Sequence, residues 1–385
     1  MKKNEEYIVD IIDNGYEGEG IAKIDNFTIF IPGAIKGEKV KVVIVKVTSS
    51  FAYGKILEIL EKSVNRVADV DCSTYKRCGG CNLRHINYSK TLELKKNTVQ
   101  NLVNKTLKNK VEVKDTIGME NPFNYRNKAQ YPVGTDKQGN PVIGVFANRT
   151  HEVIEIKECM IQNKQSEKIA KYICDFAKEN NISVYNEEIR KGLLRHIVVK
   201  VGVKTNEIMC ILVLNGREIN NEEKLVKELT GKFPNIKTIV KNINMQNTNV
   251  ILGKENINIY GDGYIYDKLG DYTFKISPLS FYQINPIQTE KLYNLALEKI
   301  ELTGKEILFD LYCGIGTIGI FMANKAKEVY GIEIVEQAIE DAKENCKINN
   351  ITNAKYYAGD TEKLLSDLIE KQNIIPDIVV VDPPR

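Results

Sequence analysis

The last hundred or so residues alternate helical and strand patterns, and this alternation constrains the fold more than any other feature of the sequence. Helical periodicity is found at 287–300, 316–325, 336–349 and 361–371. Apolar strand patterns separate these helices, at Glu306–Leu311, 328–333, 354–358 and Asp377–Val381. Strands that alternate with helices form parallel sheets with helices on both faces. The sequence therefore predicts a doubly wound, Rossmann-like α/β domain over residues 271–385.

The first of these strands runs into a glycine-rich turn, Asp310-Leu-Tyr-Cys-Gly-Ile-Gly-Thr-Ile-Gly319. Its glycines fit the pattern G-x-G-x-x-G, which lets a cofactor approach the backbone beside a helix N-terminus. Glu333 ends the next strand, about 20 residues on, where a carboxylate can accept hydrogen bonds from both ribose hydroxyls. These features suit NAD and S-adenosylmethionine (AdoMet) equally well. A turn needed only for packing is the third alternative.

The turn Asp382-Pro383-Pro384-Arg385 separates the two cofactors. It follows the fourth strand, so its carboxylate is expected in the crevice outside the strand ends, where ligands of such sheets bind. An Asp-Pro-Pro turn at this point is typical of AdoMet-dependent methyltransferases, and hydride transfer has no need of it. The arginine that follows disfavours methylation of adenine amino groups, because those enzymes usually carry an aromatic residue there.

A segment just before the first helix, Pro278–Asn285, carries two further candidates. Gln283 can hydrogen-bond the amino-acid end of the cofactor, and Phe281 can face a base. The alternative is a plain linker in which Asn285 and Pro286 start the helix.

Three of the eight cysteines lie within ten residues of each other, at Cys72, Cys78 and Cys81. Thiols this close, on a loop with two glycines, suit a tetrahedral metal or an iron–sulfur cluster, and both need a fourth ligand. Cys159 is the candidate because its neighbours are polar, whereas Cys174 lies on an amphipathic helix and Cys210 inside an apolar strand, where buried structural thiols are common. Spacing alone does not separate zinc from a cluster.

Residues 1–60 show short alternating runs broken by glycines. About five strands, Phe27–Ile31 among them, suggest a small closed barrel of the oligonucleotide-binding kind. Residues 61–270 mix helical patterns, such as Ser89–Leu107, with hairpin patterns, and this mixture predicts an α+β central domain.

Charge is unevenly spread along the 385 residues. Residues 61–150 hold 16 Lys and Arg against 8 Asp and Glu (+8), whereas residues 271–385 hold 12 against 18 (−6). A basic segment suits contact with a phosphate backbone, although a solvated lysine-rich surface is an equal alternative. No apolar run approaches the roughly 18 residues of a membrane span, so we expect a soluble, cytoplasmic protein without a membrane partner.

Together these motifs resemble the RNA (uracil-5-)methyltransferase family, and specifically its 23S rRNA branch of RlmD- and RlmCD-like enzymes. The resemblance covers essentially the whole chain and implies a TRAM barrel at 1–60, a cluster-bearing central domain that also binds RNA, and a methyltransferase domain. It implies that a 4Fe–4S cluster is bound by Cys72, Cys78, Cys81 and Cys159. It further implies AdoMet contacts from Gln283, Tyr312, Glu333 and Asp382, with Thr317 and Asp360 as weaker candidates.

The resemblance also implies a substrate and a reaction. A monomeric enzyme would act on a uridine in an rRNA loop; rRNA is favoured over tRNA because the tRNA branch is expected to lack both barrel and cluster. A Cys thiolate adds at uracil C6, C5 takes the methyl group, and a Glu removes the C5 proton. In the family that Cys and Glu follow the Asp-Pro-Pro-Arg turn, and neither Cys313 nor Cys346 is a convincing substitute.

We therefore expect a C-terminally truncated member whose nucleophile and base lie beyond Arg385. The chain as given is predicted not to transfer methyl groups; turnover of a uridine-containing rRNA fragment would contradict this. Two alternatives stay open, an iron–sulfur NAD-dependent oxidoreductase and a non-catalytic RNA-binding fragment.

Overall fold

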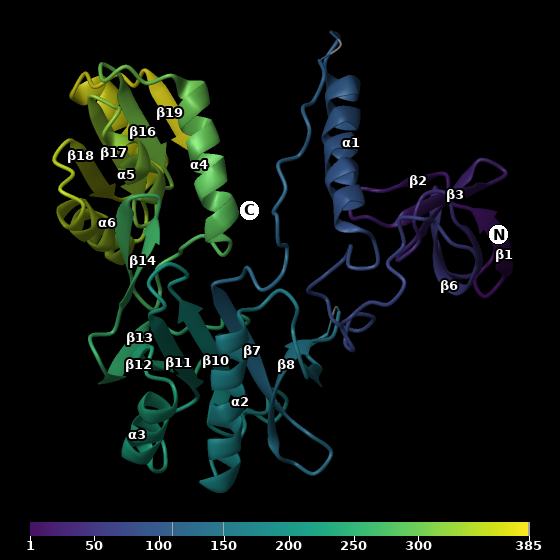
Figure 1. The fold of residues 1–385 in the computed structure, drawn as a ribbon, viewed down its shortest axis with the longest axis horizontal. Helices are drawn as coiled ribbons and strands as arrows, with labels where there is room; N and C mark the ends of the chain where they lie inside the picture. Colours follow the sequence, from purple (N-terminus) through teal and green to yellow (C-terminus); the bar gives the residue numbers. More distant parts are fainter. Residues whose placement is uncertain (110, 149, 384–385) are drawn as a thin grey trace. The chain divides into compact units, whose positions relative to one another are not determined.

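The computed structural model describes residues 1–109, 111–148 and 150–383 (Figure 1). Pro384 and Arg385, the last two residues of the predicted Asp-Pro-Pro-Arg turn, lie outside the described residues. The chain forms two compact units. The first holds Met1–Pro122 and Phe146–Glu152, and the second holds Phe123–Val145 and Val153–Arg385. The domain boundaries predicted at residues 60 and 270 remain predictions.

The first unit begins with a six-stranded sheet in the order β1-β5-β6-β4-β3-β2. Its strands are β1 (Glu6–Asp10), β2 (Asp13–Asn14), β3 (Gly20–Ile24), β4 (Phe27–Ile31), β5 (Lys39–Val47) and β6 (Phe51–Glu61). Alternate residues, among them Ile29, Ile31 and Val42, point inward and are fully buried, as the period of two in a half-buried strand requires. The Ile12 N–H, in the connection from β1 to β2, bonds the Ile21 carbonyl of β3 at 2.9 Å, so the chain that leaves β1 at one edge of the sheet meets β3 near the other edge.

A long helix follows the barrel. The helix predicted at Ser89–Leu107 is present as α1 (Tyr88–Thr106), but some of its apolar side chains are exposed. Val99 is 47% exposed and Leu102 is 53% exposed. Helical periodicity was a correct guide to the element and a poor guide to its environment.

The second unit contains a seven-stranded sheet in the order β13-β12-β11-β10-β7-β8-β9. Its strands are β7 (Lys128–Thr135), β8 (Pro141–Phe146), β9 (Val153–Glu155), β10 (Leu194–Val201), β11 (Ile208–Leu214), β12 (Ile236–Ile243) and β13 (Glu255–Tyr260). The helices α2 (Lys164–Glu179) and α3 (Glu222–Lys232) cover one face (Figure 1). Every residue of β10 and β11 is buried, because both faces of the sheet are covered.

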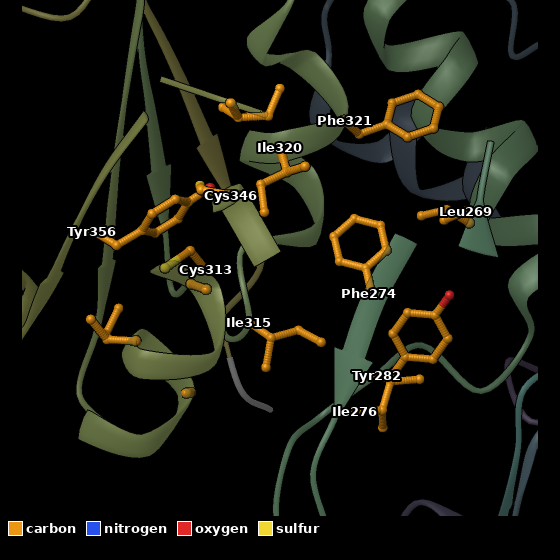
Figure 2. Close-up of a cluster of buried hydrophobic side chains, with 14 of the residues drawn as sticks. Leu269, Phe274, Ile276, Tyr282, Cys313, Ile315, Ile320, Phe321, Cys346 and Tyr356 are labelled. Carbon is orange, nitrogen blue, oxygen red and sulfur yellow. The ribbon is translucent and has the colours of Figure 1, made fainter. Parts of the chain in front are cut away.

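The opposite face shares one core with the C-terminal part of the chain. Val198, Met209 and Val240 belong to the same buried cluster as the hairpin of β14 (Ile265–Leu269) and β15 (Tyr272–Ile276). Phe274 of the hairpin is fully buried. Figure 2 shows it between Tyr282 on one side and, on the other, Ile315 of the glycine turn with Ile320 and Phe321, which follow the turn.

The predicted doubly wound domain is confirmed. Four parallel strands, β16 (Ile307–Leu311), β17 (Glu328–Glu333), β18 (Ala354–Ala358) and β19 (Ile378–Val381), pair in the order β18-β17-β16-β19. Helix α4 (Pro286–Ile300) precedes the first of these strands, and α5 (Thr317–Ala323), α6 (Glu336–Ile348) and α7 (Thr361–Ser366) lie between successive strands. The segment expected to form one helix at 361–371 forms two elements. The α-helix ends at Ser366, and a π-helical turn follows over Asp367–Lys371. No described helix combines the length and apolarity needed to cross a membrane.

Candidate cofactor site

Four predicted site residues lie at one edge of the parallel sheet. Tyr312 follows β16, Glu333 ends β17, Asp360 follows β18 and Asp382 follows β19. The carboxyl ends of parallel strands share an edge, and ligands of open α/β sheets bind there. The structure therefore brings together side chains that lie 70 positions apart in the sequence.

The glycine-rich turn serves two purposes. Gly314 has a φ of +54°, a left-handed conformation that favours glycine, and a Cβ added to it would meet nothing within 4 Å. A Cβ at Gly316 or Gly319 would lie 2.8 or 2.7 Å from the hydroxyl of Tyr356, and one at Gly331 would lie 2.3 Å from its ring. Open backbone for a ligand is thus found at Gly314, whereas the packing interpretation holds for the other glycines.

Glu333 connects this turn to the next helix. Its Oε2 accepts the Gly314 N–H at 3.2 Å and its Oε1 accepts the Val335 N–H at 3.1 Å. Carboxylate oxygens have further lone pairs, so a ligand's hydroxyls can bind the same carboxylate. The side chain is fixed by backbone donors before any ligand arrives.

The remaining predicted residues form local contacts around this edge. Gln283 Nε2 donates to Asp382 Oδ2 at 3.2 Å. The hydroxyl of Thr317, the first residue of α5, lies 3.2 Å from that of Tyr293. Asp360 caps α7 by accepting the Lys363 N–H at 3.1 Å, so its carboxylate is partly committed to the helix start.

Asp310 is a site residue that the sequence analysis did not select. It lies in β16, is fully buried, and accepts the Gly319 N–H at 2.8 Å. Burial raises the pKa of Asp310 to about 7 against the effect of the Gly319 hydrogen bond, and the Asp382 and Glu333 carboxylates raise it further. A charged residue inside an otherwise apolar strand was the available signal.

This raised pKa predicts a pH-dependent stability. Because the folded pKa lies above the unfolded value of about 3.9, the stabilising contribution of Asp310 is complete below that value and is lost as pH rises through about 7. The midpoint of thermal unfolding of the ligand-free wild type should therefore fall, relative to that of Asp310→Asn, between pH 5 and pH 8. A difference that stays constant over this range would contradict the expectation.

Neither cysteine near the site is set up as a nucleophile. Cys313 and Cys346 are both buried. Burial, with smaller contributions from Asp310 and Glu333, raises the pKa of the Cys313 thiol far above its usual range, and burial raises the pKa of Cys346 to about 11. Both thiols are therefore protonated at neutral pH, in agreement with the sequence analysis, and a thiol is a poor nucleophile.

The predicted iron–sulfur loop is not confirmed. Cys72, Cys78 and Cys81 lie in the first unit and Cys159 in the second. Within residues 1–109, 111–148 and 150–383, no group of three or more His, Cys, Asp or Glu side chains is placed to hold a metal ion. The Gly80 N–H does donate to Cys78 Sγ at 3.3 Å, a contact that suits a thiolate.

Several side chains of types that often contact RNA are buried. Tyr131 is 1% exposed, and its hydroxyl lies 3.0 Å from that of Ser166. Arg195 is 5% exposed and donates to the carbonyls of Asn244 and Gln246 at 2.6 and 2.9 Å. His196 is also buried, and burial lowers its pKa to about 4. These side chains hold the second unit together rather than face a nucleic acid.

Comparison with known proteins identifies the fold's relatives. Residues 87–376 match the family model described as tRNA (Uracil-5-)-methyltransferase, and residues 2–57 match the TRAM domain. The chain belongs to the tRNA (uracil-5-)-methyltransferase family. Its relatives include RNA methyltransferases, described as uncharacterized, from Clostridium tetani (46% identical, covering 100% of this chain and 83% of the relative) and Clostridium acetobutylicum (48%, covering 100% and 84%).

A solved member of the family has a similar structure along most of its length. The crystal structure of the Pyrococcus abyssi tRNA (uracil-54, C5)-methyltransferase in complex with S-adenosyl-L-homocysteine is 25% identical, with a TM-score of 0.74. It matches 98% of this chain, and this chain matches 83% of it. Because 98% of this chain is matched, the match includes most of the TRAM residues. A tRNA-directed member therefore also has the barrel, and the expectation that the barrel separates rRNA-directed from tRNA-directed members is wrong.

Proposed function

We propose that this chain provides the AdoMet-binding and RNA-binding parts of a methyltransferase that modifies C5 of uracil in RNA. The observation that carries the proposal is the group of Tyr312, Glu333 and Asp382 at the carboxyl edge of the parallel sheet, beside the open backbone of Gly314. Family membership and the S-adenosyl-L-homocysteine in the Pyrococcus structure support the same cofactor. AdoMet supplies an electrophilic methyl group when it is bound.

The chain's own residues would bind and orient this cofactor. Glu333 would accept hydrogen bonds from the ribose hydroxyls, since backbone donors already fix its carboxylate. Gln283 and Asp382, which bond each other, would hold the amino-acid end, and Tyr312, 37% exposed, would present its ring to the adenosine. Thr317 and Asp360 lie on the same edge as weaker candidates.

Binding experiments separate this proposal from the oxidoreductase alternative. Calorimetry of the purified chain should show binding of S-adenosylhomocysteine and none of NADH. Binding of NADH in preference to S-adenosylhomocysteine would contradict the proposal.

We further propose that the RNA is 23S rRNA and that the protein acts as a cytoplasmic monomer. The resemblance of the cysteine pattern to the rRNA branch supports this substrate, whereas the barrel is neutral. Equilibrium binding of 23S rRNA fragments and of tRNA transcripts at equal salt would distinguish the two, because affinities for nucleic acids fall steeply with salt. Tighter binding of tRNA would overturn the rRNA assignment.

We also propose that Cys72, Cys78, Cys81 and Cys159 bind a 4Fe–4S cluster. These four cysteines are partly exposed, whereas Cys174, Cys210, Cys313 and Cys346 are buried. Cysteine thiolates are the ligands of iron–sulfur clusters, and a cluster can reach cysteines that are partly exposed. Burial raises the pKa of both Cys174 and Cys210 to about 12, which keeps those two protonated.

Anaerobic purification should therefore give a brown protein that absorbs near about 400 nm and holds about four iron atoms per chain. The variant Cys81→Ser should lose most of the iron and the absorbance. The matched control Cys174→Ser should keep both. Stoichiometric zinc in place of iron, or full iron content in Cys81→Ser, would contradict the assignment.

A further inference from the structure

The segment Ser277–Asn285 joins β15 to α4 and carries Gln283; we call it the linker. Its first turn is held by Lys200, the next-to-last residue of β10 in the seven-stranded sheet. Lys200 Nζ donates to the carbonyl oxygens of Ser277 at 2.8 Å and Ser280 at 2.9 Å. One side chain thus fixes two backbone positions of the linker.

The far end of the linker is held by Asn127, which immediately precedes β7. Asn127 Nδ2 donates to the carbonyl of Gln283 at 3.0 Å, and its backbone N–H donates to the carbonyl of Ile284 at 3.1 Å. The Asn127 carbonyl in turn accepts the Val201 N–H at 2.8 Å. Because Val201 follows Lys200 directly, the hydrogen bonds that fix the two ends of the linker come from neighbouring positions in the sheet.

The turn is also held from its other side. Asp341 of α6 accepts hydrogen bonds from the hydroxyls of Ser277 at 3.1 Å and Ser280 at 2.7 Å. Asp341 is 2% exposed and Lys200 is 5% exposed. The turn therefore lies between a buried carboxylate that binds its side chains and a buried amine that binds its carbonyls.

Lys200 lies in an unfavourable place for a charge. Its partner across the strand pair is a second lysine, Lys128. Burial, with a smaller contribution from Lys128, lowers the pKa of Lys200 to about 7. Apolar residues of similar volume often replace a buried charged group without loss of stability. The two bonds to linker carbonyls are the contacts that an apolar residue cannot make.

The linker that is fixed in this way presents functional side chains. Gln283 bonds Asp382 in the cofactor site, and Phe281 is 59% exposed. A binding side chain must be held to within about 0.5 Å of its productive position. The position of Gln283 is set by its backbone, and its own carbonyl is one of the four that the sheet holds.

We propose that Lys200 and Asn127 are positioning residues for the cofactor site: they fix the linker backbone so that Gln283 meets Asp382 and the ligand. The inference rests on the proposed AdoMet site. It assigns to the seven-stranded sheet a part in cofactor binding that Lys200 and Asn127 exert through the linker backbone.

The test uses the full chain and a reporter in the linker. The protein contains no tryptophan, so Phe281→Trp supplies a single tryptophan, which can be excited apart from the tyrosines, at an exposed linker position. In this background Lys200→Met should lower the fluorescence anisotropy of the tryptophan and weaken S-adenosylhomocysteine binding about tenfold. The matched control is Lys241→Met, because Lys241 is 7% exposed and bonds a backbone carbonyl, that of Arg217, at 2.8 Å in the same sheet away from the linker.

The control should change neither readout. Equal anisotropy and equal affinity in a folded Lys200→Met variant would overturn the proposal, and so would equal losses in Lys241→Met. If Lys200→Met does not fold, Asn127→Ala removes the bond to the Gln283 carbonyl and must show the same two losses. If the wild-type chain binds no S-adenosylhomocysteine, the proposed function fails. The anisotropy of the Phe281→Trp background still tests whether Lys200 and Asn127 fix the linker.

Discussion

Glu333→Gln is expected to weaken the binding of S-adenosylhomocysteine roughly 10- to 150-fold, because hydrogen bonds to a charged acceptor contribute about 1.5–3 kcal/mol. The carboxylate already accepts the N–H groups of Gly314 and Val335. An amide of the same shape places an NH₂ group where one of these donors or a ribose hydroxyl should bind. Titration calorimetry of the purified chain measures the change.

Two comparisons isolate the ribose contact from a general disturbance. Glu328→Gln alters a glutamate at the opposite end of the same strand, where it pairs with Lys355, and should leave the affinity unchanged. A 2′-deoxy analogue of S-adenosylhomocysteine should bind the wild type more weakly than the parent ligand, but the Glu333→Gln variant about equally. Unchanged discrimination between the two ligands in the variant would show that Glu333 does not bind the ribose.

Arg66→Met is expected to destabilise the first unit by about 3–5 kcal/mol, the usual cost of leaving a buried charge without its partner. Glu38, which lies in the turn before β5, is 1% exposed, and Arg66 binds it through Nε at 2.5 Å and Nη2 at 2.7 Å. Arg66 also donates to the Gly33 carbonyl at 2.7 Å. Hydrogen exchange of peptides from β3 to β6 in the full chain reports the stability of this unit.

The sign of the pH dependence distinguishes this ion pair from a packing effect. In the wild type the Arg66 and backbone hydrogen bonds outweigh burial, and the pKa of Glu38 is lowered, so its contribution is present at neutral pH and lost as pH falls. Without Arg66, burial should raise that pKa. The loss of stability should then be greatest near pH 7 and smaller near pH 4.

A matched control completes this test. Lys36→Met removes an exposed pair with Asp13, in which the side chains are 56% and 53% exposed, and should cost less than about 1 kcal/mol. A similar cost at both pH values in Arg66→Met would mean that lost packing, rather than the uncompensated carboxylate, explains its effect.

The sequence allowed prediction of the doubly wound domain because its signals are local. Each strand is short and apolar, each helix is periodic, and Glu333 and Asp382 follow strands at fixed places. The pairing of β4 with β6 in parallel, and the position of β10 between β11 and β7, depend on contacts between distant segments. No local pattern encodes such an order.

The site itself was predicted only in part, because only some of its residues have local signals in the sequence. Residues at strand ends were found, but Asp310 and Tyr356, which lie within strands, were missed because their roles depend on what packs against them. Arg195 and His196 carry polar groups of the kind that bind RNA. The structure buries both of them, because hydrogen-bonding groups serve an interior as well as a surface when partners are available.

The ring of Tyr356 restricts how this protein can be altered. Three glycines, at 316, 319 and 331, leave room for it, and it comes from β18, a strand that is remote from them in the sequence. A chimera that exchanges β18 with a relative must therefore carry a side chain no larger than this ring or restore matching space in the glycine turn. We expect natural variation at these four positions to be linked. Relatives with alanine at position 331 should carry a residue smaller than tyrosine at position 356.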